Sequence, residues 1–324
     1  MFNETSRTQR IILAIVAVVA GVYLIMLAPT QAMQTLKIAM DQAFVRLIPH
    51  DADFYPAIPI LSATFSIWMV LLVFAGALSL MLIKKLYDGE KWARATAMGI
   101  YAIPAVGGIT MVIPWFVLVL AEYPEKGVPA ATISGIPPVM PVMLLGLFFY
   151  YVMLMADKDS LKNKILKLIP YTLIGIVAGM VFMNAQHGVR YFIHIPGAFL
   201  ENPPHFTSPL AHAITNLDHL DWRTFEFTSE QMVYSPQTLA LLLGGYLNYV
   251  SSAILILAIP FLAMKNKIGW YMATTAALAT AAASFQGFFV RHSTEWLQGG
   301  FLSLALLIIL LIPIFKKFLI EEGE

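Results

Sequence analysis

Eight apolar stretches, separated by short polar connections, divide this chain of 324 residues. A helix crosses the hydrocarbon core of a bilayer with about 20 apolar residues, and each stretch approaches or exceeds that length. The stretches lie near 10–32, 57–83, 95–120, 138–156, 166–190, 237–264, 269–291 and 297–318. The sequence therefore predicts an all-α, polytopic transmembrane bundle of eight spans, folded as a single integral membrane domain over residues 1–324.

The composition agrees with a membrane location. Hydrophobic residues make up 59% of the chain and charged residues 12%, and the mean hydropathy is +0.75. These values are typical of a protein that has a lipid bilayer as its main partner. A net charge of +1 predicts no nucleic-acid partner. The absence of cysteine excludes disulfides, thiolate metal sites, iron–sulfur ligation and covalent c-type haem.

The distribution of Lys and Arg predicts the orientation. Fourteen of the twenty basic residues lie in alternate connections and so on one side of the membrane: Arg7, Arg10, Lys84, Lys85, Lys91, Arg94, Lys158, Lys162, Lys164, Lys167, Lys265, Lys267, Lys316 and Lys317. The positive-inside rule places that side in the cytoplasm. An even number of spans then puts both termini in the cytoplasm, and we expect a multi-pass protein of the cytoplasmic membrane.

Two outer segments carry helical periodicity outside the spans. In residues 33–56 the apolar residues Leu36, Met40, Phe44 and Leu47 recur at helical spacing, which predicts an amphipathic helix on the outer surface. A second such helix is predicted near 208–220, inside the outer loop 192–236. A loop of this length is typical of a functional segment.

The membrane interior lacks ionisable groups. No Asp or Glu falls inside a predicted span, and no Lys or Arg falls mid-span. Ion-coupled pumps and transporters usually carry such groups at membrane depth, so the sequence argues against that class. A permease or channel that is not ion-coupled stays possible, because Pro104, Gly107, Gly108 and Pro114 would allow the third span to break.

Polar residues gather instead at the outer ends of the spans. All seven histidines fall in the outer half or the outer loops. The candidate binding residues come from the ends of the fifth and seventh spans and from the sixth span: His187, Arg190, Tyr191, Asn248, Arg291, His292 and Glu295. The fifth and seventh spans run in the same direction, so their polar ends share one depth.

Two cofactor hypotheses suit this cluster. In the first, His187 and His292 are axial ligands of a b-type haem, and Arg190 or Arg291 pairs with its propionates. In the second, the cluster binds a quinol, and a histidine with a tyrosine or Glu295 accepts its protons. The alternative is that these side chains only reach the interface or cap helix ends.

A metal site is not predicted in the outer loop. His205, His212 and His219 recur every seven residues. On a helix, that spacing puts neighbouring side chains about 10 Å apart along the axis, whereas helical metal pairs use a spacing of four.

The sequence thus favours an integral subunit of a larger electron-transfer complex, with a haem b or quinol site near the outer face. The expected partners are other membrane or extracytoplasmic subunits. The alternatives are an accessory or scaffolding subunit without chemistry of its own and a non-ion-coupled permease or channel. No catalytic residue is predicted.

Overall fold

A computed structural model describes residues 5–51, 54, 57–193 and 236–320, and within these ranges the chain is helical and contains no strand. The prediction of an all-α fold is confirmed. The elements are α1 (Arg7–Met26), α2 (Ala28–Gln42), the π-helix η1 (Ala43–Leu47), α3 (Ala57–Met81), α4 (Ile83–Tyr87), α5 (Lys91–Pro114), the π-helix η3 (Trp115–Leu120), the 3₁₀ turn η4 (Pro124–Lys126), α6 (Met140–Met155), α7 (Leu161–Ile193), α9 (Pro236–Ala263), α10 (Lys267–Arg291), α11 (Thr294–Leu311) and α12 (Pro313–Ile320).

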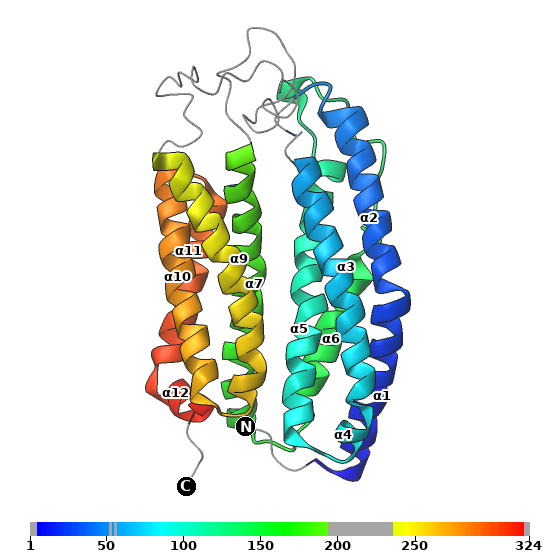
Figure 1. Cartoon of the computed structure of the whole chain (residues 1–324), viewed down its shortest axis with the longest axis vertical. Helices are drawn as coiled ribbons and strands as arrows, with labels where there is room; N and C mark the ends of the chain where they lie inside the picture. The colour runs from blue at the N-terminus through cyan, green and yellow to red at the C-terminus, as the bar shows by residue number, and fades with distance from the viewer. Residues whose placement is uncertain (1–4, 52–53, 55–56, 194–235, 321–324) are drawn as a thin grey trace, which may run out of the picture.

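The helices form two groups that run along one long axis (Figure 1). The first half contains α1 to α6, and the second half contains α7 to α12. Within the second half, α9 packs against α7 and α10, and α11 packs against α10 and α7. The halves meet mainly where α5 contacts α9 and α7. The start of α1 and the end of α12 lie at the same end of the molecule (Figure 1).

Seven helical segments are long and apolar enough to cross a membrane, which supports a multi-pass membrane protein. They are residues 7–47, 57–81, 91–120, 161–189, 240–263, 267–290 and 294–311. The remaining predicted span corresponds to α6, an apolar helix of 16 residues that is shorter than the others. At a rise of 1.5 Å per residue, α6 is about 24 Å long, somewhat less than the hydrocarbon core.

The first helix differs from its prediction. Residues 33–47 are helical, but they prolong the first span in a helical segment of 41 residues, Arg7–Leu47, and do not form a separate surface helix. Packing explains this, because the hydroxyl of Thr35 accepts a hydrogen bond from the backbone N–H of Val139 at 2.9 Å. The helix predicted near 208–220 and the outer loop from 194 to 235 lie outside the described residues.

A buried arginine fixes the C-terminal end of this long helix. The Arg46 side chain donates hydrogen bonds to the carbonyl oxygens of Leu118 at 2.9 Å and Val119 at 3.1 Å, both in η3. It also reaches the carbonyl of Ala121 at 3.2 Å. The last carbonyls of a helix have no partners within the helix and carry a partial negative charge. Arg46 therefore caps η3 and ties it to η1.

Small residues bring helix backbones together in both halves. A Cβ atom added at Gly76 of α3 would lie 2.8 Å from the carbonyl oxygen of Gly21 in α1. One added at Gly188 of α7 would lie 2.9 Å from Cα of Gly245 in α9. Both contacts are closer than any larger side chain allows, as expected where membrane helices pack through glycine.

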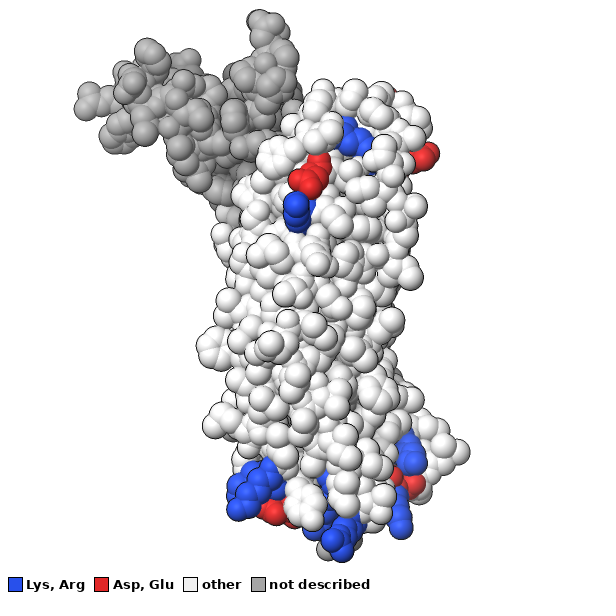
Figure 2. Space-filling model, turned by 90° about the vertical axis from the view of Figure 1, so that its right-hand side faces the viewer, with Lys and Arg blue, Asp and Glu red and all other residues white. Residues whose placement is uncertain are grey.

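Charged residues avoid the middle of the molecule. On the face drawn in Figure 2, Lys and Arg gather at one end, fewer charges lie at the other, and the long band between them is uncharged. The end with more basic residues carries the α6–α7 connection with Lys158 and the α9–α10 connection with Lys265. This pattern is typical of helices that cross a lipid bilayer.

Candidate functional site

One pair from the predicted outer cluster is in contact. Nδ1 of His187, near the C-terminal end of α7, lies 3.3 Å from Oε1 of Glu295 in the first turn of α11. The side-chain amide of Asn184, one turn earlier on α7, donates a hydrogen bond to the backbone oxygen of Glu295 at 3.3 Å. These contacts join α7 to α11. The side chains of His187 and Glu295 stay about one-third exposed.

His292 has different neighbours. It ends α10 in a left-handed conformation with φ of 55°, and its ring lies edge-on to Phe288 with 6.0 Å between the ring centroids. The two predicted haem ligands therefore have different neighbours. His187 on α7 contacts Glu295, and His292 after α10 contacts Phe288. The side chains of Arg190, Tyr191 and Arg291 fall outside the described part of the chain, as do His205, His212 and His219.

The α9 residues of the predicted cluster lie on two faces of the helix. Asn248 is fully buried, and it follows Gly244, which faces Ala283 of α10, by one turn. Tyr246 and Tyr249 instead line a cleft on the opposite side of α9, toward the first half. These two tyrosines are therefore separate from the His187–Glu295 pair.

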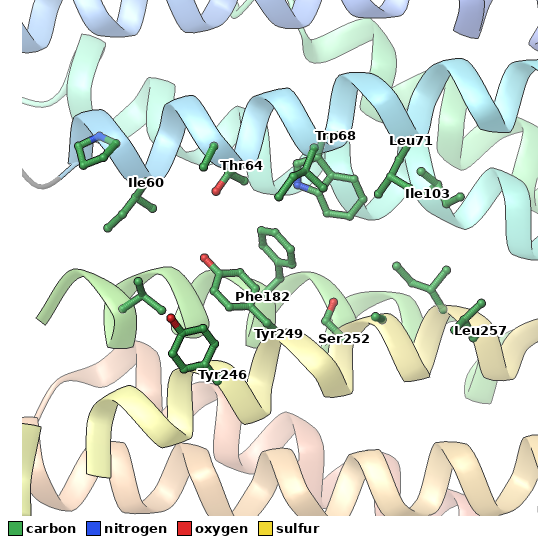
Figure 3. Close-up of a pocket in the computed structure, with 16 residues that line it drawn as sticks. Ile60, Thr64, Trp68, Leu71, Ile103, Phe182, Tyr246, Tyr249, Ser252 and Leu257 are labelled. Carbon is green, nitrogen blue, oxygen red and sulfur yellow. The ribbon is translucent and has the colours of Figure 1, made fainter. Parts of the chain in front are cut away.

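The cleft lies between α3 of the first half and α9 of the second and has a volume of about 650 Å³ (Figure 3). Its walls are almost entirely apolar. Side chains from both halves point into it, among them Ile60, Trp68, Leu71, Phe182, Tyr246 and Leu257. Ile67, Tyr246 and Leu257 are each more than half exposed at membrane depth, so the cleft opens sideways toward lipid.

Polar groups interrupt the apolar wall at Thr64 and Tyr249 and at Ser252, whose hydroxyl donates a hydrogen bond to the carbonyl of Ala178. The buried hydroxyl of Thr64 on α3 accepts a hydrogen bond from the amide of Gln186 on α7 at 3.3 Å. The hydroxyl of Tyr249 on α9 points toward Thr64 across the cleft (Figure 3). We call Thr64, Gln186 and Tyr249 the cleft triad. Beside it, the ring of Phe182 lies 5.1 Å from that of Trp68 and 4.8 Å from that of Tyr249.

Little in the sequence predicts the cleft triad. Thr64 is a single hydroxyl in an apolar span, where it is compatible with a helix that only packs. Gln186 lies next to His187 in the chain but about 100° away around the helix, so it turns toward α3 while His187 turns toward α11. The only signal is that a polar residue within a span must find a partner.

A second group of buried polar residues lies inside the second half. A Cβ atom added at Gly299 of α11 would lie 2.3 Å from the amide nitrogen of Asn184 and 3.1 Å from the hydroxyl of Ser284 on α10. The amide oxygen of Asn184, the Ser284 hydroxyl and both amide atoms of Asn248 find no hydrogen-bond partner among the described protein atoms. Buried groups of this kind normally bond to ordered water. These buried polar groups are suited to bind water.

At the opposite end, four buried charges join the two halves. Asp157, in the α6–α7 connection, forms ion pairs with Arg94 of α5 and with Lys167 of α7, the latter at 2.5 Å. Lys167 also pairs with Asp159. All four side chains are at least 96% buried, and their charges balance. The sequence placed these residues among the basic connections, whereas packing buries them as a network.

Comparison with known protein families, with curated proteins and with solved structures gives no match for this chain.

Proposed function

We propose that this protein is an integral membrane subunit that binds a quinol in the cleft between α3 and α9, as part of a larger electron-transfer complex. The observation that carries the proposal is the cleft itself, an apolar, aromatic-lined space of about 650 Å³ with a few polar groups in its wall. A quinol has an aromatic head with two hydroxyl groups and a long apolar tail. Binding sites for such molecules are mostly apolar with a few placed polar groups.

The cleft offers a separate place to each part of the ligand. Within the cleft triad, the hydroxyl groups of Thr64 and Tyr249 line the cleft and would hydrogen-bond to the head, while Gln186 holds Thr64 from behind. Trp68 and Phe182 supply faces and edges for the ring of the head. Leu71 and Leu257 lie about two turns further along α3 and α9, where the tail would pass out into the lipid.

The proposal includes a partner because the chemistry requires one. Oxidation of a quinol to a quinone releases two electrons and two protons, and the electrons must pass to a redox centre of another subunit. The topology belongs to the proposal as well. In it, α6 is the eighth crossing, the basic end faces the cytoplasm with both termini, and the cleft triad lies in the outer half of the membrane, where protons would leave to the outer side.

Blocking the cleft tests the proposal. Ala63 lines the cleft and is exposed, so Ala63→Trp fills the space without replacing a buried side chain. Ala77 is also exposed on α3 but does not line the cleft, so Ala77→Trp is the matched control. In nanodiscs, we expect calorimetric titration with a short-tailed quinone to show affinity at least about tenfold weaker for Ala63→Trp, because overpacking costs about 1–3 kcal/mol. Ala77→Trp should bind like the wild type.

A further variant separates the head from the tail. Thr64→Val keeps the shape of the side chain but removes the hydroxyl of the cleft triad. It should weaken binding of the quinone several-fold and leave binding of a simple alkyl chain unchanged. A wild-type protein that binds no quinone, or an Ala63→Trp protein that binds it normally, would overturn the proposal.

A haem b is the second candidate, and the His187–Glu295 contact favours it. A carboxylate on one ring nitrogen fixes the tautomer of a histidine and leaves the other nitrogen free to bind metal. His292 would be the second ligand. We expect a b-type Soret and alpha band in the reduced-minus-oxidised spectrum of protein from its native membrane, lost in His187→Ala and in His292→Ala. A folded native preparation without these bands would exclude the haem.

A further inference from the structure

A second groove runs along the first half at its basic end. It has a volume of about 760 Å³ and lies where α1, α6 and the start of α7 meet. Its walls are mainly apolar and come from Ile12 of α1 and from Phe148, Tyr151, Val152 and Met155 of α6. Ile12 is 47% exposed and Phe148 is 56% exposed, so this wall faces outward at membrane depth. The groove is separate from the α3–α9 cleft and shares no residue with it.

The charged end of the groove is positive. Lys158 and Lys164 line it, and neither has an ion pair among the described residues. The acidic residue in the lining, Asp157, is already neutralised by its buried pairs with Arg94 and Lys167. Two lysines at the end of an apolar groove therefore remain available to an anion.

The start of α7 adds to this potential. Ser160 precedes α7, and its hydroxyl accepts a hydrogen bond from the backbone N–H of Asn163 at 3.3 Å, as a residue that caps the helix start does. The start of a helix carries a partial positive charge, which favours a negative group beside it. Lys164 lies one turn further along the same helix.

We infer that this groove binds an anionic phospholipid of the leaflet at the basic end of the molecule. The phosphate contacts Lys158 and Lys164, and one acyl chain lies along Phe148, Val152 and Ile12. A lipid is the occupant that fits because the apolar wall belongs to helices that span the bilayer, whose surroundings are lipid tails. Basic pockets between membrane helices on the cytoplasmic side recognise anionic headgroups in this way. The inference does not depend on quinol binding.

The test compares two double variants of equal charge. Lys158→Gln/Lys164→Gln removes both groove lysines, and Lys84→Gln/Lys162→Gln removes two exposed lysines of the same end that do not line the groove. Each protein is delipidated and titrated with phosphatidylglycerol or phosphatidylcholine, and bound lipid is counted by native mass spectrometry. We expect the groove variant to lose roughly fivefold in affinity for phosphatidylglycerol per lysine, since one basic residue near an anionic surface contributes about 1 kcal/mol. The control variant should keep the wild-type affinity.

A variant in the apolar wall of the groove tests lipid binding without changing the charge of the protein. Val152→Trp fills the groove next to the lysines without altering charge, and it should weaken binding of phosphatidylglycerol while the melting temperature stays near that of the wild type. An equal loss of affinity for phosphatidylglycerol in both lysine variants would mean that the lipid is attracted by the overall charge and not bound in the groove, and it would overturn the inference. Equal binding of the two lipids by the wild type would overturn it as well.

Discussion

At the end of the first half that lies opposite the basic end, one guanidinium group forms hydrogen bonds with the backbone of another helix. Arg46 is only 5% exposed and bonds to carbonyl oxygens of η3 and of the segment that follows it. In the sequence, Arg46 is merely one of six basic residues on the outer side. Its role could not be predicted, because it depends on α5 changing to a π-helix after Pro114 and leaving carbonyls exposed near Arg46.

Removing this cap should destabilise the protein. Arg46→Met keeps the length of the apolar stem but loses the hydrogen bonds, and we expect a loss of about 2–3 kcal/mol in the free energy of unfolding. Thermal unfolding in detergent, followed by circular dichroism, measures the change. Lys37→Met is the control, because Lys37 is exposed on the same helix and loses the same charge. A melting temperature equally lowered in both variants would contradict a specific role for Arg46.

Most helices could be predicted from the sequence, and the departures have identifiable causes. The spans predicted at 57–83, 237–264 and 269–291 match α3, α9 and α10 to within two residues at each end, because the change in hydropathy marks both ends and a basic loop marks one of them. The last span, predicted as 297–318, is broken before Pro313 into α11 and α12. In the first span, periodicity predicted that the chain stays helical after residue 32. The direction in which this helix continues depends on packing against residues far along the chain, such as Val139.

The candidate sites were predicted less completely than the helices. The sequence drew attention to His187, Glu295 and Asn248 as a binding cluster, which stays a prediction, but it could not assign them to faces, because a face is defined only by the neighbouring helix. The cleft consists mainly of ordinary apolar residues such as Ile67, and no pattern distinguishes these from residues that only contact lipid. The buried charges had a weak signal, since Asp157 and Asp159 stand among lysines in a connection otherwise typical of basic loops.

The buried charge network links elements of both halves and should respond strongly to the loss of one member. Asp157→Asn removes the carboxylate that forms ion pairs with both Arg94 and Lys167. Breaking a buried pair from one side typically costs about 3–5 kcal/mol. We expect a large fall in melting temperature, whereas Asp88→Asn, at an exposed position of the same end, should change little.

A charge-balanced variant of this network distinguishes electrostatics from packing. In Arg94→Met/Asp157→Leu, both members of one pair become apolar and the Lys167–Asp159 pair remains. This double variant should recover much of the stability that Asp157→Asn loses, since apolar residues can replace a buried ion pair at little cost. A double variant less stable than the single one would show that the shape of the ion pair, and not its charge balance, holds α5 and α7 together.

At the scale of the whole molecule, the two halves are joined tightly at the basic end, and further along the axis α3 stands apart from α9 at the cleft. At the basic end, the charge network joins α5 to α7, and a Cβ atom added at Gly99 of α5 would lie 3.0 Å from Pro260 of α9. Further along the axis, α3 and α9 diverge around the cleft. A tight joint beside an open cleft gives a fixed, lipid-accessible space, which is suited to binding a membrane-soluble ligand.

Whether the short helix α6 crosses the membrane decides the topology of the chain. Ser134 and Ser160 are exposed on either side of α6, so they lie on opposite faces of the bilayer only if α6 spans it. Because the chain has no cysteine, Ser134→Cys and Ser160→Cys each introduce a single label site. In intact cells, we expect a membrane-impermeant maleimide to label Ser134→Cys and to reach Ser160→Cys only after permeabilisation. Labelling of both before permeabilisation would mean that α6 does not cross, that the spans number seven, and that the two termini lie on opposite sides.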